Sequence, residues 1–414
     1  MRNILLTGWV LVVFTGANGL EAILHGENWP QWRGPTRDGR VAQVSWPADL
    51  KPASLKQLWR VELGPSYSGP IVVGDHVFVT ETRDKAFEVV RCLHRDTGKQ
   101  IWETNWKGAM RVPFFAASNG SWIRSTPSYS DGRLYVAGMR EILQCLDSET
   151  GKIVWTVDFV EKFGAPLPTF GFVCSPLVVG DFLYTQAAGA VVKIDKHAGQ
   201  VVWRTFDDGG GMHGSAFSSP VWHAVHGQDQ LVVQTRTTLA GLDPVEGTEL
   251  WSQEIPAFRG MNIVTPAMAE NSVFTSSYGG KSLQFALSAD GDSIGIREEW
   301  SNKAQGYMSS PVVIDGHVYL HLRNQRFACI DLATGETKWT TTPFGKYWSM
   351  IVNDDQILAL DQEGELLLIR ATPKQFDLID TRKISDEETW GHLAISGKQL
   401  FVRELNAITA FTWE

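Results

Sequence analysis

One pattern recurs along this chain: an eleven-residue motif with glycine at its seventh position and tryptophan at its eleventh. Five clear copies occupy residues 92–102, 145–155, 193–203, 241–251 and 329–339. The third position is Asp in four of these copies and His94 in the other. A sixth copy, with four extra residues, runs from Ala286 to Trp300. Repetition at intervals of about 40–50 residues is typical of propellers and solenoids, so this motif constrains the fold more than any other feature.

Each copy has the composition of a β-hairpin. An apolar strand ends near the Asp, the glycine supplies the positive φ that a tight turn requires, and a second strand ends in the tryptophan. Upstream of each copy a proline opens another strand, where its missing N–H does least harm. These strand starts lie at residues 68–70, 125–127, 174–176, 218–220, 264–266 and 309–311. Each unit therefore predicts four short antiparallel strands, which make one propeller blade.

The number of blades follows from the two ends of the repeat. A seventh unit, residues 350–378, has Leu378 where the tryptophan is expected, and an eighth begins near Trp390 but has room for only three strands. Trp59 lies in an early strand, residues 55–63, that has no blade before it. We predict an all-β, eight-bladed propeller in which this early strand completes the last blade and leaves few open sheet edges. Seven blades is the alternative, if the seventh unit is not a full blade.

The motif tryptophans and glycines are expected to fasten neighbouring blades. A tryptophan side chain buries roughly 150–250 Å², so we expect these residues to stabilise the fold and not to take part in catalysis. The predicted docking residues are Trp59, Gly98, Trp102, Gly151, Trp155, Gly199, Trp203, Gly247, Trp251, Trp300, Gly335 and Trp339.

The motif resembles the tryptophan-docking motif of the propellers of alcohol dehydrogenases that depend on pyrroloquinoline quinone (PQQ). The copy at 145–155 matches that motif except for Cys145 at its first place, and the likeness spans roughly residues 50–414. Residues 28–39 are similar to the opening of many exported bacterial PQQ-repeat proteins. Binding proteins share the repeat, including the propeller subunit of the outer-membrane β-barrel assembly machinery, so the resemblance implies the fold more strongly than the function.

The resemblance also implies what an enzyme of this type would need. PQQ dehydrogenases hold the quinone between a tryptophan floor and two adjacent, disulfide-bonded cysteines, and they hold Ca²⁺ with Glu, Asn and Asp oxygens. The four cysteines here are Cys92, Cys145, Cys174 and Cys329. No two are adjacent, and we expect small buried side chains rather than a disulfide. Isolated acids such as Glu161, Asp207, Asp208 and Asp386 do not form a Ca²⁺ pattern. We therefore expect no catalytic residues, cofactor or metal, and keep a PQQ- and Ca²⁺-dependent dehydrogenase as the alternative.

Charge and the N-terminus bear on partners and location. The formal net charge is −9, without a Lys/Arg cluster, which argues against a nucleic acid or an anionic membrane surface as partner. Residues 1–19 are predicted to be a signal peptide, with Arg2 before an apolar run at 4–14 and small residues at 15–19; an uncleaved anchor is the alternative. We expect an exported, periplasmic or extracellular protein without a later membrane span. A lead-in, 20–54, would precede a single propeller domain, 55–414.

Segments that enter the first strand of each blade are expected to meet at the central funnel, and they are rich in aromatic residues. Inserts at 103–124, 157–173 and 204–217 would lie on the same face. The candidate binding residues are Tyr67, Trp122, Arg124, Phe172, His213, Phe217, Tyr307, Trp348 and Trp390. They predict a non-catalytic module that binds a protein or peptide of the cell envelope, or a small ligand. The alternative is that these rings only fill the funnel.

Overall fold

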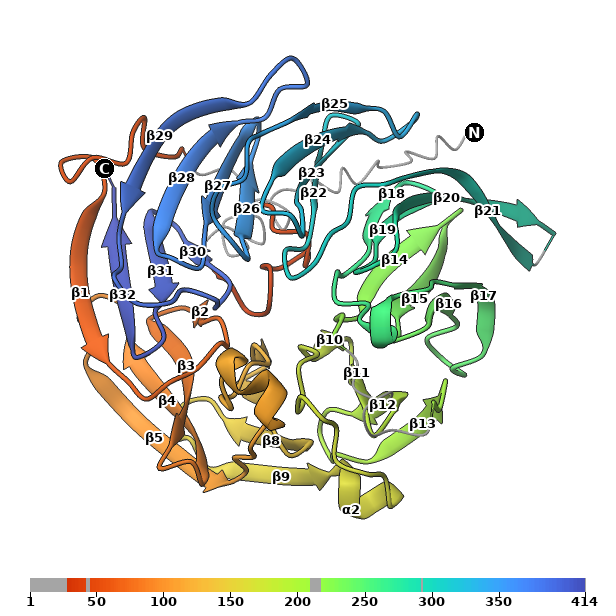
Figure 1. Cartoon of the computed structure of the whole chain (residues 1–414). Helices are drawn as coiled ribbons and strands as arrows, with labels where there is room; N and C mark the ends of the chain where they lie inside the picture. Colours follow the sequence, from red (N-terminus) through yellow and green to blue (C-terminus); the bar gives the residue numbers. More distant parts are fainter. Residues whose placement is uncertain (1–27, 42–44, 209–216, 292, 414) are drawn as a thin grey trace, which may run out of the picture.

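The computed structural model describes residues 28–41, 45–208, 217–291 and 293–413. Within these residues, eight sheets of four antiparallel strands stand around a central axis (Figure 1). This confirms the predicted eight-bladed propeller and shows that the seven-bladed alternative was wrong. The predicted signal peptide and His213 lie outside the described residues.

Seven blades each use four strands that follow one another in sequence. Blade 1 contains β2 (Ile71–Val73), β3 (His76–Arg83), β4 (Phe87–His94) and β5 (Gln100–Lys107). Blade 2 contains β6 (Ser128–Ser130), β7 (Arg133–Gly138), β8 (Ile142–Asp147) and β9 (Ile153–Asp158). Blade 3 contains β10 (Leu177–Val179), β11 (Phe182–Ala187), β12 (Ala190–Asp195) and β13 (Val201–Thr205). Blade 4 contains β14 (Val221–Val225), β15 (Gln228–Gln234), β16 (Thr238–Leu242) and β17 (Glu249–Glu254).

The second half of the ring has the same plan. Blade 5 contains β18 (Ala267–Ala269), β19 (Ser272–Ser276), β20 (Ser282–Asp290) and β21 (Ser293–Asn302). Blade 6 contains β22 (Val312–Ile314), β23 (His317–His321), β24 (Phe327–Asp331) and β25 (Thr337–Thr340). Blade 7 contains β26 (Ser349–Asn353), β27 (Gln356–Leu360), β28 (Glu365–Arg370) and β29 (Asp377–Lys383). Short helical turns lie at η1 (Phe114–Asn119), α2 (Phe159–Phe163) and η2 (Phe258–Gly260).

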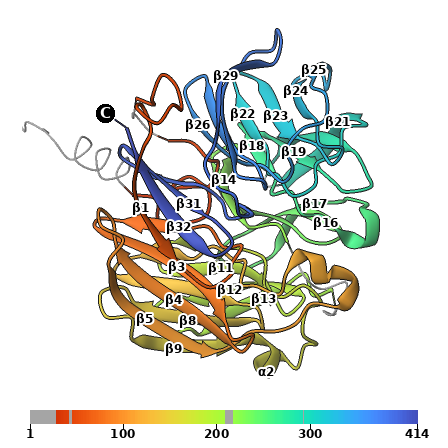
Figure 2. The same ribbon diagram turned by 60° about the vertical axis from the view of Figure 1, so that its left-hand side comes forward.

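Blade 8 closes the ring with strands from both ends of the chain. It contains β30 (Ala394–Ser396), β31 (Gln399–Arg403), β32 (Ala407–Thr412) and, at its outer edge, β1 (Lys56–Glu62). The pairing of β1 with β32 runs from Lys56 opposite Thr412 to Glu62 opposite Ala407, and both ribbon views place the two strands side by side (Figures 1 and 2). Buried Arg403 donates hydrogen bonds to the carbonyl oxygens of Gly64 and Ala407, which ties the seam together.

The motif tryptophans reach into the next blade as their spacing suggests. A Cβ added to Gly151 would lie 2.5 Å from the Trp102 ring, and the Trp102 indole N–H donates to the Ser148 carbonyl oxygen at 2.9 Å. The same packing joins Trp59 to Gly98, Trp155 to Gly199, Trp203 to Gly247 and Trp300 to Gly335. Trp339 donates its indole N–H to Thr372 of blade 7.

Trp251 departs from the predicted docking. Its indole N–H donates to Gln230 of its own blade at 2.7 Å and lies against Gly241 of that blade. The long β20–β21 hairpin of blade 5 explains this difference, because its apolar residues Leu287 and Ile294 share a core with Trp251. The extra residues of the stretched motif therefore cover Trp251 instead of offering it a glycine.

The cysteine positions also follow from the strand register. Cys92, Cys145 and Cys329 lie directly opposite Trp102, Trp155 and Trp339, where a small apolar side chain fits beside the indole. All four cysteines are buried free thiols, as predicted. None of the helices in the described part of the chain has the length and apolar character needed to cross a membrane.

Candidate functional site

The funnel mouth is the end of the central channel formed by the residues just before the first strand of each blade. It holds a cavity of about 210 Å³ at the axis. Six of the nine predicted binding residues line this cavity: Tyr67, Arg124, Phe217, Tyr307, Trp348 and Trp390. Trp348 contributes little surface, because it is only 2% exposed and stacks on His321 at 4.5 Å in the blade 6–7 core.

The other three predicted residues are not part of the described cavity. Phe172 was expected to be an exposed funnel residue, and this was wrong: it is buried in the core between blades 2 and 3, 6.0 Å from Phe159. The reason is that Phe172 packs against buried Phe159 of α2, while Phe170 two residues earlier lines the cavity. Trp122 covers Gly120 beside the cavity instead of lining it. His213 is outside the described residues.

Four lining residues with aromatic rings were not among the sequence candidates: Trp32, Phe170, Tyr347 and His392. Phe170 and Tyr347 are close neighbours in sequence of the predicted Phe172 and Trp348. The aromatic-rich segments therefore indicated the right loops but not which ring turns towards the axis. Trp32 lies in the lead-in, and nothing in its local sequence links it to the funnel.

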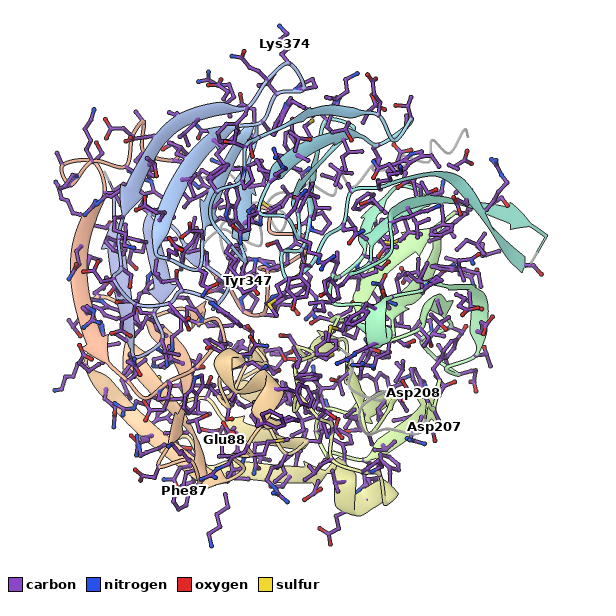
Figure 3. All side chains as sticks on the ribbon, in the orientation of Figure 1. Phe87, Glu88, Asp207, Asp208, Tyr347 and Lys374 are labelled. Atoms are coloured by element: carbon purple, nitrogen blue, oxygen red, sulfur yellow. The ribbon has the colours of Figure 1, made fainter. Side chains whose placement is uncertain are left out.

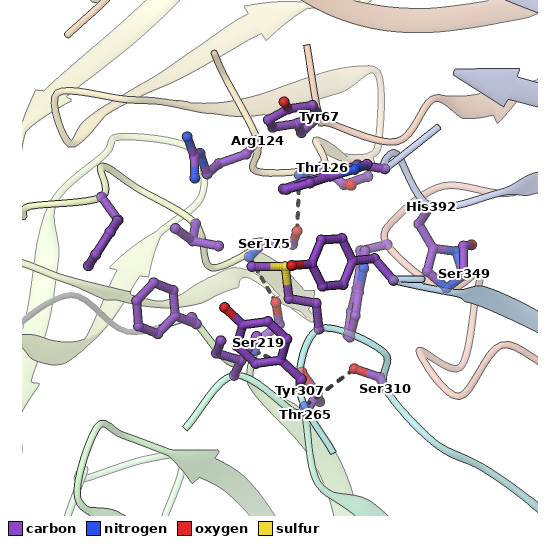
Figure 4. Close-up of a pocket in the computed structure, with 18 of the residues that line it drawn as sticks. Tyr67, Arg124, Thr126, Ser175, Ser219, Thr265, Tyr307, Ser310, Ser349 and His392 are labelled. Atoms are coloured by element: carbon purple, nitrogen blue, oxygen red, sulfur yellow. Dashed lines mark hydrogen bonds between the residues drawn. The ribbon is translucent and has the colours of Figure 1, made fainter. Parts of the chain in front are cut away.

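Five hydroxyl groups, one from each of blades 2 to 6, form a row along this cavity, which we call the hydroxyl row (Figure 4). Each accepts the backbone N–H of the equivalent residue in the preceding blade, and a hydroxyl can donate its own proton as well. The bonds run from Gly69 to Thr126 (3.1 Å), Thr126 to Ser175 (3.0 Å), Ser175 to Ser219 (2.9 Å), Ser219 to Thr265 (3.0 Å) and Thr265 to Ser310 (3.4 Å). The second residue of the strand-opening triplets therefore links blades and presents donors to the channel.

Five aromatic rings, which we call the aromatic arc, follow the funnel wall from blade 5 to blade 1. They are Tyr278, Tyr307, Tyr347, Trp390 and Tyr67. Successive ring centroids are 4.7, 5.6, 4.8 and 4.4 Å apart. Stacked, tilted and edge-to-face pairs at such distances stabilise one another. Burial raises the pKa of Tyr307 to about 12, so its phenol is a neutral donor at physiological pH.

Three cations accompany the arc. Arg323 lies 4.5 Å from the Tyr278 ring centroid, Lys346 lies 4.6 Å from that of Tyr347, and Arg124 lies 5.9 Å from that of Tyr67. Desolvation lowers the pKa of Arg124 to about 10, which still leaves it charged at neutral pH. Arg323 and Lys346 line a second cavity of about 270 Å³, which shares Tyr307 and Tyr347 with the first.

Carboxylates are missing from the described lining of both cavities. Glu388 is the nearest acid to the arc that the contacts identify: it accepts the Tyr67 hydroxyl at 3.2 Å and the Gln362 amide at 3.1 Å. It lines neither cavity. The funnel mouth therefore combines ring faces, hydroxyl donors and positive charge, which suits a ligand that carries negative charge.

The lead-in segment supplies the floor. Trp32 faces the cavity, and the guanidinium carbons of Arg33 and Arg37 each lie 5.5 Å from its ring. Arg37 donates to the carbonyl oxygens of Pro176 and Ser175 in blade 3, at 2.8 and 2.9 Å. Arg33 donates to that of Pro311 on the far side, at 2.6 Å. The lead-in thus crosses the channel and separates the funnel mouth from the opposite end.

The donor set does not fit the Ca²⁺ of a quinone dehydrogenase. Calcium takes six to eight oxygen ligands, carboxylates prominent among them. The described lining of the funnel offers no Asp or Glu. Among the described residues, no three His, Cys, Asp or Glu side chains gather as a metal would require. The buried cysteines also lie on separate strands, Cys92 on β4 and Cys145 on β8.

The fold and the funnel together define a β-propeller built from PQQ-type tryptophan-docking repeats. Residues 86–341 match the family model described as outer membrane protein assembly factor BamB. This match covers more than half of the chain, so the chain belongs to that family, and the resemblance inferred from the motif is confirmed.

Individual relatives agree with this assignment. The outer membrane protein assembly factor BamB of Yersinia pestis is 23% identical over 262 residues, 59% of this chain and 63% of the relative. The dehydrogenase subunit of the alcohol dehydrogenase (quinone) of Gluconacetobacter polyoxogenes is 26% identical over 211 residues, 46% of this chain and 27% of the relative. The chain spans less than two thirds of the length of these curated relatives.

A solved structure shows the same fold. The crystal structure of BamB from Moraxella catarrhalis superposes with a TM-score of 0.63 at 14% sequence identity, covering 87% of this chain and 98% of that one. At this identity the likeness concerns the fold alone.

Proposed function

We propose that this chain is an exported, non-catalytic binding module of the cell envelope, which captures a protein partner or a ligand at the funnel mouth. The observation that carries the proposal is the pair of adjoining funnel cavities, lined by aromatic rings and cations. Convergent aromatic and polar groups in a preformed hollow are typical of binding sites.

The location rests on two observations. Residues 1–19 have the sequence pattern of a signal peptide. The family description and the Yersinia pestis relative both name outer membrane protein assembly, a process of the cell envelope. A fusion of residues 1–30 to a reporter that is active only outside the cytoplasm tests export.

The proposed binding face has a direct test. Replacing Tyr67, Tyr347 and Trp390 with alanine removes three consecutive rings of the arc, and we expect this variant to lose capture of its envelope partners. Partners are identified by cross-linking in envelope extracts followed by mass spectrometry. Trp348 is left unchanged because it is a core residue and its loss would destabilise the fold.

A matched control separates binding from folding. Phe87→Ala with Leu378→Ala removes two side chains from the outer rim, far from the axis; Figure 3 shows the position of Phe87. This control should keep full capture. If the triple variant stays folded and captures the same proteins as the wild type, the funnel mouth is not the binding site.

The quinone dehydrogenase remains a second candidate because of the likeness to the Gluconacetobacter polyoxogenes subunit. The funnel residues do not match the calcium ligands that such an enzyme uses, as described above. The test is to add PQQ and Ca²⁺ and to measure quinone absorbance after desalting, together with dye reduction by alcohols and sugars. Retained quinone with turnover would replace the binding proposal.

A further inference from the structure

We propose that the aromatic arc binds an acidic oligosaccharide, a chain of sugar rings that carry carboxylate or sulfate groups. This inference rests on the proposed function, because it requires the funnel mouth to be a binding site. It names the ligand class from three features of the arc: its shape, its charge and its polar groups.

The shape of the arc suits an extended ligand built of rings. Its five aromatic side chains come from five consecutive blades, 5 to 8 and then 1, so they curve along the funnel wall instead of enclosing one small molecule. The two cavities share Tyr307, Met308 and Tyr347, which makes one continuous path. Flat aromatic faces provide apolar area at low entropic cost, and the C–H faces of sugar rings can pack on them.

Two of the three cations of the arc have no carboxylate partner among the described residues. Arg323, Lys346 and Arg124 stand at one end, the middle and the other end of the arc. No described carboxylate forms an ion pair with Arg323 or Lys346, whereas Arg124 donates to the Gly120 carbonyl oxygen at 2.9 Å and is attracted by Glu88. By contrast, Arg83 contacts Glu81 and Glu103 at 2.6 and 2.7 Å. In a protein of net charge −9, two such cations along one path attract an anionic chain.

The polar groups favour a sugar over an acidic peptide. The hydroxyl row of blades 2 to 6 lines the same cavity as the arc, and each of its hydroxyls accepts one backbone N–H. The amides of Asn119 and Gln325 line the two cavities as well. Sugar hydroxyls both donate and accept, so they match such groups. An acidic peptide such as oligoglutamate brings carboxylates but no rings that could pack on the aromatic faces of the arc.

The experiment uses four probes of similar length and isothermal titration calorimetry. Oligogalacturonate presents rings with carboxylates, its methyl ester presents the same rings without charge, a sulfated galactan oligomer presents rings with sulfate, and oligoglutamate presents carboxylates without rings. We expect at least one acidic sugar to bind, and its binding to weaken with added salt. The methyl ester and oligoglutamate should bind at least about ten-fold more weakly.

Matched variants locate the site. Arg323→Gln with Lys346→Gln should weaken acidic sugar binding about ten-fold, since two ion pairs are lost. Arg297→Gln with Lys374→Gln removes the same charge from exposed positions away from the arc, and Figure 3 shows Lys374 at the outer rim; this pair should leave binding unchanged.

The outcomes separate this inference from the proposed function. If neither acidic sugar binds, or if oligoglutamate binds as tightly, the ligand class is wrong, whereas loss of partner capture in the triple aromatic variant would still support the funnel mouth as a site. If the outer-rim charge pair weakens binding as much as the arc pair, the attraction is non-specific and the inference fails. If both assays are insensitive to the triple variant, both proposals fail.

Discussion

Cationic side chains at the two ends of the central channel have opposite surroundings. At the lead-in end, Arg33 and Arg37 are buried and donate to carbonyl oxygens of Pro311, Pro176 and Ser175 on opposite sides of the ring. The Nε atom of Arg33 and that of Arg37 are buried and have no hydrogen-bond partner among the described residues. At the funnel mouth, Arg323 is exposed and its charge faces an aromatic ring without a carboxylate partner in the described chain.

The difference separates structural cations from cations that are available to a ligand. A buried guanidinium is stable only when hydrogen bonds replace its water, so Arg33 and Arg37 act as braces between blades 6 and 3. An exposed cation over an aromatic ring keeps its water and adds little stability. The same residue type therefore serves the fold at one end and, as we propose, binding at the other.

Trp29→Ala should cause the largest loss of stability. Trp29 is 2% exposed, and its backbone pairs with Val72 of β2 through hydrogen bonds of 2.7 and 2.9 Å. Its ring also fills the space above Gly34, where a Cβ would lie 2.7 Å from it. Truncating a fully buried tryptophan costs about 3–5 kcal/mol. Urea unfolding followed by circular dichroism measures the change.

Trp390→Ala is the matched variant at the funnel mouth. Trp390 is partly exposed and lines the cavity, so its truncation should cost less than half as much free energy of unfolding. Equal losses for the two tryptophans would contradict the distinction between a structural end and a binding end.

Arg37→Met should cost about 3 kcal/mol. Methionine keeps much of the side-chain volume but leaves the Pro176 and Ser175 carbonyl oxygens without their donor, and each buried unsatisfied polar group costs roughly 1–3 kcal/mol. Arg323→Met provides the comparison, with an expected change within about 0.5 kcal/mol. Both values come from urea unfolding at pH 7. A near-neutral Arg37→Met would show that the braces do not hold the ring.

The fold could be predicted from the sequence because the same hairpin motif recurs several times along the chain. Glycine at a tight turn and tryptophan beside it recur together, and Trp59 without a preceding blade predicted the closing strand that pairs with β32. Trp251 could not be predicted, since its partner depends on the length of the β20–β21 hairpin in the next blade. A repeat motif fixes which residues occupy equivalent positions, but not what a neighbouring insertion covers.

The site was predicted less completely, for a reason of side-chain direction. Tyr67, Tyr307 and Trp390 were predicted correctly, because each lies just before the first strand of its blade and so reaches the funnel cavity. Within one loop, however, adjacent residues point to opposite sides, so Tyr347 faces the cavity while Trp348 is buried. Of the three cations of the arc, Arg124 was predicted. Arg323 and Lys346 were missed, because they lie in different loops and meet only in the folded ring.

The smallest expected effect concerns His392, which lies between the two ends of the channel. Its ring is 5.9 Å from that of Trp32 and lines the base of the funnel cavity. Desolvation, together with the nearby charge of Arg33, lowers the pKa of His392 to about 3. A pKa that is lower in the folded state means that the unfolded chain binds more protons below about pH 6.5, so stability falls as the pH falls.

His392→Gln should therefore remove part of the loss of stability on acidification. Between pH 6.5 and 5 we expect the free energy of unfolding of the wild type to fall by about 1–2 kcal/mol more than that of this variant, since one pKa unit corresponds to about 1.4 kcal/mol.

The pKa of His392 should also depend on the brace Arg33. Arg33→Met removes a positive charge beside His392 and should raise the pKa of His392 towards 6.5, as measured by an NMR titration of the imidazole. Lys346→Gln, at the outer part of the funnel mouth, should leave that pKa unchanged. If both variants shifted it equally, the charges at the two ends of the channel would not be electrostatically separate.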